Sequence, residues 1–173
     1  MNSFAPILLM LRFFLAIVLL TGSAEKLLDI GIFTGQVRNY RLLPDALVQP
    51  FALLFPATEI GAALLLFFSA TSIPVIAVLL AATLGVMINL QRGRTHIDCG
   101  CGGPAGQPIS GFILGRNILL MMLAWLSARH FTFNLLSGLD VSIALLGGMT
   151  MSGFYFAANQ LVANQLRMHS ERT

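Results

Sequence analysis

The two cysteines of this 173-residue chain stand two positions apart, in the tripeptide Cys99-Gly100-Cys101. They lie in a glycine-rich loop, residues 92–110, between two long apolar stretches. A disulfide within such a tripeptide closes a very small ring, so its geometry is strained and its bond is easily reduced. A loop this short also gains almost no chain-entropy stabilisation. The pair therefore predicts thiol–disulfide exchange, in which an outside thiolate attacks and forms a mixed disulfide.

Two other interpretations of the loop stay open. The cysteines are then either inert residues of a glycine-rich turn or ligands of a metal. His96 and Asp98 bring the number of donors in the loop to four, and thiolates favour copper(I) or zinc. All four donors crowd into six residues, whereas a dedicated zinc site uses better-spaced ligand pairs. We therefore assign no metal ligand.

Arg116 and Asn117 follow the cysteine loop, near the start of the next apolar stretch. A thiolate gains from nearby positive charge, so Arg116 is a candidate to reach back and activate a cysteine. The alternative is an arginine whose stem lies along apolar surface while its charge reaches the membrane interface.

Arg12 and Glu59 lie within apolar stretches, where an ionised group is costly unless it is paired or hydrated. One interpretation is an Arg–Glu or Lys–Glu pair that fixes helix packing. The other gives Glu59 a role in proton handling near a redox site or quinone, with Lys26 and Arg116 tuning the local charge.

Composition indicates the elements that must position these residues. Of the chain, 57% is hydrophobic and 10% is charged, so we assign it to a lipid environment. We expect one integral membrane domain, residues 1–173, with no nucleic-acid partner. The predicted fold is an all-α, polytopic transmembrane bundle of about five spans, a four-helix core plus one. An apolar helix of about 20 residues crosses the hydrocarbon layer, which places the spans at about 4–22, 48–68, 73–91, 111–128 and 139–162.

Three local features complete this prediction. The segment after the first span has helical apolar spacing with interleaved arginines, which suits a short interfacial helix ended by Pro44. Ser110 is placed to cap the helix after the cysteine loop. A cleavable signal peptide is the alternative for the first span, but we expect a retained helix because the bundle needs it.

The chain resembles the MauE family of methylamine utilisation proteins, within the wider group of small DoxX-like membrane proteins. Four pieces carry the resemblance and cover most of the chain. They are Gly22-x-x-x-Lys26, Tyr40-x-x-Leu43-Pro44, Pro56-x-x-Glu59, and Arg92-Gly93 followed by Asp98-Cys99-Gly100-Cys101-Gly102, Ser110 and Arg116-Asn117. The chain departs from the pattern at Gly103, where an aromatic residue is expected. The site residues that the resemblance implies are Cys99 and Cys101, supported by Asp98, Arg116, Asn117, Glu59 and Lys26.

The resemblance implies processing, transport or maturation of the small (beta) subunit of methylamine dehydrogenase, beside a thioredoxin-like partner of the MauD type. That subunit is periplasmic and rich in disulfides, so a membrane thiol–disulfide oxidoreductase would serve it. A membrane quinone is a possible electron acceptor by analogy with DsbB-like bundles. The alternatives are a non-catalytic membrane chaperone or transport subunit and a copper-handling protein.

The expected location is the inner membrane, and two inferences about orientation disagree. The basic residues gather on the face of the cysteine loop, which the positive-inside rule places in the cytoplasm: Lys26, Arg38, Arg41, Arg92, Arg94, Arg167 and Arg172. A relay for a periplasmic client instead requires the cysteines to face the periplasm, where disulfides persist. We favour a cysteine pair that faces the periplasm or is embedded in the membrane.

Overall fold

The computed structural model describes residues 5–68, 71–94, 97–100, 107–128 and 137–170. Within these ranges the chain forms helices α1 (Ala5–Leu28), α2 (Ile30–Tyr40), α3 (Asp45–Phe68), α4 (Ile73–Gln91), α5 (Gly111–Ser127) and α6 (Gly138–Ser170). The predicted all-α class is confirmed. Helices α1, α3, α4 and α6 are long and apolar enough to cross a membrane, and α5 is a shorter apolar helix. The chain is a multi-pass helical membrane protein.

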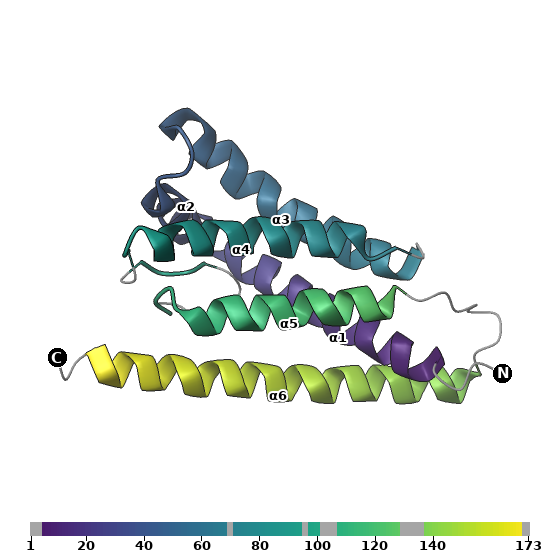
Figure 1. Ribbon diagram of the computed structural model, residues 1–173. Helices are drawn as coiled ribbons and strands as arrows, with labels where there is room; N and C mark the ends of the chain where they lie inside the picture. Colours follow the sequence, from purple (N-terminus) through teal and green to yellow (C-terminus); the bar gives the residue numbers. More distant parts are fainter. Residues whose placement is uncertain (1–4, 69–70, 95–96, 101–106, 129–136, 171–173) are drawn as a thin grey trace.

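Figure 1 shows how the bundle positions the cysteine loop. Helix α1 packs against α3, α5 and α6, while α4 packs against α3 and α5. The connection from α4 to α5 lies at the same end of the bundle as α2 and the C-terminal end of α6 (Figure 1). We call this the cysteine end: α2, the last turn of α4, residues 97–100 and 107–110, and the first turn of α5.

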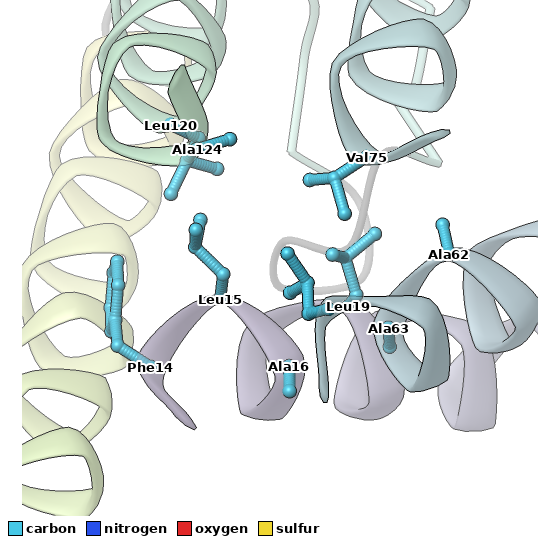
Figure 2. Close-up of a cluster of buried hydrophobic side chains, with 10 residues drawn as sticks. Phe14, Leu15, Ala16, Leu19, Ala62, Ala63, Val75, Leu120 and Ala124 are labelled. Atoms are coloured by element: carbon cyan, nitrogen blue, oxygen red, sulfur yellow. The ribbon is translucent and has the colours of Figure 1, made fainter. Parts of the chain in front are cut away.

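The main apolar core lies around the middle of α1 (Figure 2). Leu15 of α1 points towards Leu120 and Ala124 of α5, and Leu19 lies beside Val75 of α4 (Figure 2). Lipid is as apolar as these side chains, so close packing rather than water exclusion must hold such helices together. This explains the small residues where helices approach.

The contact between α1 and α6 depends on Gly148. A Cβ atom at this position would lie 2.7 Å from Phe13 Cβ and 3.1 Å from the Met10 carbonyl oxygen. Glycine is therefore required for the two backbones to come this close.

Three helix ends differ clearly from the predicted boundaries, and one of them is that of α6, which runs to Ser170 although the expected end lies near residue 162. Helix α1 runs to Leu28, past the expected end near residue 22, because Lys26 is buried inside the bundle and does not mark the membrane surface. Helix α2 ends at Tyr40 rather than at Pro44. Arg41 takes up a left-handed conformation (φ 48°) there, and its N–H donates to the Arg38 carbonyl oxygen.

Candidate functional site

The turn that ends α4 directs the chain into the cysteine loop. Gly93 has a φ of +69°, its N–H donates to Leu90 O, and the Arg94 N–H donates to Asn89 O. These two bonds form a Schellman motif, whose left-handed position favours glycine. The Arg92 guanidinium also donates to Arg41 O at 3.4 Å, which joins this turn to the segment after α2.

Beyond the turn, two short stretches of the loop pair as antiparallel backbone. The Cys99 N–H donates to Gln107 O and the Ile109 N–H donates to Ile97 O, each at 3.0 Å, on either side of a bridge between Asp98 and Pro108. Cys99 and Gln107 are therefore directly opposite, and their side chains lie on the same face. Burial follows the alternation, because Ile97, Cys99, Gln107 and Ile109 are buried while Asp98 is exposed.

Cys99 is disulfide-bonded and 6% exposed. Cys101, the other cysteine of the sequence, lies outside the described residues, as does His96. The Tyr40 hydroxyl of α2 donates to the Cys99 carbonyl oxygen at 2.6 Å. Burial raises the pKa of the Tyr40 phenol well above its ordinary value, although the positive charge of Arg116 acts in the opposite direction. Tyr40 therefore stays a hydrogen-bond donor and fixes the position of Cys99.

Gly100 supplies the space and the backbone conformation that the loop needs beside α2. Its φ is +63°, and a Cβ atom there would lie 2.5 Å from Gln36 Oε1 and 3.1 Å from Gln36 Cδ. Any side chain at this position would strain the backbone and displace Gln36. The loop thus packs its glycine directly onto α2.

A cavity of about 250 Å³ adjoins Cys99. Cys99 and Gly100 form one part of its wall, and the rest comes from α2, α3, α4 and the segment after α2. Gln36 is the amide side chain in a lining that is otherwise mainly aliphatic and aromatic: Phe33, Val37, Tyr40, Leu42, Leu43, Phe51, Phe55, Ala81, Ala82, Leu84, Gly85 and Ile88. The cavity therefore suits a flat, apolar, lipid-soluble molecule next to a disulfide.

Two polar groups of the loop are buried without a partner among the described residues. They are both polar atoms of the Gln107 side chain, on a residue that is 2% exposed, and the Ser110 hydroxyl. Ser110 occupies the N-cap position of α5, as predicted, but its side chain makes no capping bond. An unsatisfied buried polar group costs about 1–3 kcal/mol, so these two positions require an explanation other than stability.

Lys26 and Glu59 form a buried ion pair between α1 and α3. The Lys26 ammonium donates to both Glu59 oxygens, at 2.6 and 2.7 Å, and lies 5.7 and 5.5 Å from the ring centroids of Phe33 and Phe55. Of the two pairings left open by the sequence, the structure contains the Lys–Glu pair. Because Phe33 and Phe55 also line the cavity, the pair lies just beyond its aromatic wall. A proton-handling role for Glu59 stays a prediction.

Arg12 is bound to backbone groups instead. Its guanidinium donates to Leu66 O at 2.9 Å and to Ser127 O at 3.0 and 3.1 Å. Both acceptors lie in the last turns of their helices, α3 and α5, where carbonyl groups lack partners within the helix. Arg12 therefore caps two helix ends.

Arg116 and Asn117 belong to a buried hydrogen-bond network in the bundle. The Arg116 guanidinium donates to Asn117 Oδ1 at 3.1 and 3.3 Å and to Asn159 Oδ1 at 3.3 Å. Asn117 Nδ2 donates to Thr83 Oγ1 at 3.2 Å, so the network joins α4, α5 and α6. The expected effect of Arg116 on a cysteine thiolate stays a prediction, as does the supporting role of Asp98.

The sequence prediction missed three residues that lie in the cysteine loop or contact it. They are Gln36, Gln107 and the hydroxyl of Tyr40, a residue noted only as part of a motif. The pattern Ile97-x-Cys99 carries a signal, since alternating apolar residues before the glycines indicate a strand, and Ile109 after the glycines offers an apolar partner for it. Within the described part of the chain, no three Cys, His, Asp or Glu side chains form a group able to hold a metal.

Comparison with known proteins assigns the family. The family model described as methylamine utilisation protein MauE matches residues 4–129. The chain belongs to the MauE family. The matched region includes Lys26, Glu59, Cys99, Gln107 and Arg116, whereas α6 lies beyond it.

Several curated relatives carry the name "Methylamine utilization protein MauE". The protein of Paracoccus denitrificans is 34% identical over 157 residues, which cover 87% of this chain and 84% of the relative. That of Methylophilus methylotrophus is 34% identical over 168 residues, 90% of this chain and 86% of the relative. That of Methylorubrum extorquens is 38% identical over 124 residues, 66% of this chain and 67% of the relative. No solved structure matches this chain.

Proposed function

We propose that this MauE-family protein acts in methylamine utilisation as a membrane thiol–disulfide oxidoreductase. The observation that carries the proposal is the position of Cys99. It is disulfide-bonded, held by Tyr40 and by backbone pairing to Gln107, and adjacent to an apolar cavity in a membrane protein. An inert cysteine in a turn needs none of these features. The names of the relatives support the pathway.

The exchange reaction follows from the unequal exposure that we expect of the two sulfurs. Cys99 is buried, so a partner's thiolate attacks Cys101, and the electron pair of the broken S–S bond passes to Cys99. A second thiol of the partner then attacks the mixed disulfide and releases Cys101. The partner leaves as a disulfide, and Cys99 and Cys101 are left as a dithiol. Two electrons have entered this chain.

Reoxidation of the dithiol needs a two-electron acceptor, and the cavity suits a membrane quinone. Its lining is mainly apolar and its volume of about 250 Å³ accommodates a substituted ring. When bound, a quinone accepts the two electrons and two protons that disulfide formation releases. Cys99 and Gly100 would form the part of the cavity wall next to such a quinone, and Gln36 would offer it an amide beside Gly100.

The client and partner follow from the family. We place the small subunit of methylamine dehydrogenase as the final recipient of disulfides, reached through a thioredoxin-like partner. The protein then resides in the inner membrane with the cysteine end in the periplasm, although the basic residues favour the cytoplasmic side.

The first test replaces both cysteines by serine in a host that depends on this protein for growth on methylamine. We expect the dehydrogenase small subunit to accumulate with free thiols, measured by the mass added on alkylation. The control is Thr150→Val on the exposed part of α6, where the hydroxyl bonds only to Leu146 O among the described contacts. Normal disulfides in the double serine variant would contradict the proposal and favour a non-catalytic chaperone or transport subunit.

The second measurement identifies the partner. The Cys99→Ser variant keeps only Cys101, so a mixed disulfide formed there cannot be resolved by this chain. We expect it to trap a thioredoxin-like protein that is exported to the periplasm. Capture of a cytosolic thiol protein would contradict the proposed orientation.

A further inference from the structure

Gln107 faces Cys99 across the paired backbone of the cysteine loop. The Cys99 N–H donates to the Gln107 carbonyl oxygen at 3.0 Å, and directly opposite residues in such a pair have Cβ atoms about 5 Å apart on one face. The Gln107 side chain is long enough to span that gap. Its amide nitrogen and oxygen are buried, and neither has a hydrogen-bond partner among the described residues.

We infer that Gln107 is a positioning residue whose side-chain amide donates a hydrogen bond to the Cys99 thiolate when the disulfide is opened. The inference rests on the proposed function, since it concerns the same exchange reaction. A buried amide donor that lacks a partner beside the disulfide gains one as soon as negative charge develops on Cys99 Sγ.

The bond would act at one step of the reaction. Attack of a partner's thiolate on the other sulfur breaks the S–S bond and transfers its electron pair to Cys99 Sγ. Cys99 is thus the leaving group, and a leaving thiolate that is stabilised departs faster. The Gln107 Nε2–H group donates a hydrogen bond to this thiolate and keeps its proton. The negative charge on Cys99 is therefore stabilised without proton transfer.

Burial makes this contribution necessary. Cys99 is 6% exposed, so water cannot fully solvate a thiolate formed there. Tyr40 donates to the Cys99 carbonyl oxygen, so that bond holds the backbone rather than the sulfur. Gln107, by contrast, lies on the side-chain face of Cys99.

The test uses the full-length protein in detergent with Cys101→Ser, so that Cys99 is its single cysteine. The rate of Cys99 alkylation by iodoacetamide is measured from pH 5 to pH 10. In the added variant Gln107→Leu we expect the profile to move to higher pH, with alkylation about tenfold slower at pH 7 and unchanged at the high-pH plateau. In Gln107→Glu, which keeps the shape but replaces the donor by a carboxylate, we expect at least as large a shift.

Ser110→Ala is the matched control, because it removes the other buried, unpartnered group of the loop and should leave the profile in place. The other ionisable groups in and next to the surrounding elements are the same in every variant, and among the described residues they include Arg38, Tyr40, Arg92, Arg94, Asp98 and Arg116. An unmoved profile in Gln107→Leu, or an equal slowing at every pH, would overturn the inference, since the second result reports access alone.

This outcome is separate from that of the proposed function. The alkylation profile needs no client or partner, whereas the serine variants are judged by client disulfides. A shifted profile together with normal client maturation in the double serine variant would support the role of Gln107 and reject the proposed function.

Discussion

In the interior of the bundle the Lys26 ammonium lies 2.6 and 2.7 Å from the two Glu59 oxygens, whereas at the cysteine end both polar atoms of Gln107 are buried without a partner among the described residues. The interior follows the general rule that buried polar and charged side chains are hydrogen-bonded or paired. The cysteine end departs from that rule beside a disulfide-bonded cysteine. The paired groups of the interior hold helices together, whereas the unpartnered amide at the cysteine end is available to take part in thiol–disulfide exchange.

The difference has a structural basis. Lys26, Arg12 and Asn117 are carried by helices of the bundle whose packing brings acceptors from other helices within reach. Gln107 is carried by a short paired segment whose partner across the ladder is Cys99. Substitutions in the interior should therefore change stability, and substitutions at Gln107 should change reactivity.

The largest expected effect on stability comes from Lys26→Met. It leaves the Glu59 carboxylate buried without its cation, and breaking a buried ion pair in this way costs about 3–5 kcal/mol. Unfolding of the purified protein by SDS should show this loss. The double variant Lys26→Met with Glu59→Leu should recover most of it, since removing both charges is close to neutral.

Arg38→Met is the matched control for this pair. Arg38 and Asp45 lie 3.8 Å apart, with side chains 65% and 90% exposed, and exposed pairs contribute little. A loss of stability in Arg38→Met as large as that in Lys26→Met would break the distinction between buried and exposed pairs in this molecule.

Arg12→Met should have the next largest effect. It removes the donor from the Leu66 and Ser127 carbonyl groups at the ends of α3 and α5, and each buried carbonyl left unsatisfied costs about 1–3 kcal/mol. Arg12→Lys should lie between this variant and the wild type, because an ammonium lacks the planar fork that serves both carbonyls. Equal stability of all three proteins, measured by the same SDS titration, would show that Arg12 does not cap these helices.

The sequence was sufficient for the helices and for the location of the cysteine loop. Long apolar runs predict membrane helices because only a helix satisfies its own backbone in lipid, and each predicted run lies largely within an observed helix. The continuation of α1 past residue 22 could not be predicted, because Glu59, the partner that allows Lys26 to be buried, is 33 residues away along the chain. A charged residue that follows an apolar run indicates the end of a membrane span unless its buried ion-pair partner is known.

The sequence could not predict that Cys99 and Gln107 lie opposite each other, for a different reason. This arrangement depends on the register of a short ladder in which two backbone hydrogen bonds join residues 97–99 to residues 107–109. A shift of one residue in such a short pairing would turn Gln107 to the other face. The alternation of apolar residues indicates a strand, but it does not fix which residue lies opposite Cys99.

The smallest expected effects on stability come from Gln107→Leu and Ser110→Ala. Neither variant breaks a hydrogen bond to a described partner, and each removes a buried polar group that is unsatisfied. The free energy of unfolding should therefore stay within about 0.5 kcal/mol of the wild type or rise. SDS titration of the oxidised protein measures this free energy, because the disulfide is then intact and no thiolate is present.

A loss above about 1 kcal/mol for Gln107→Leu would mean that its amide stabilises the packing of the oxidised fold. Unchanged stability with a displaced alkylation profile would instead separate the two regions of the molecule, one that holds the bundle and one that reacts.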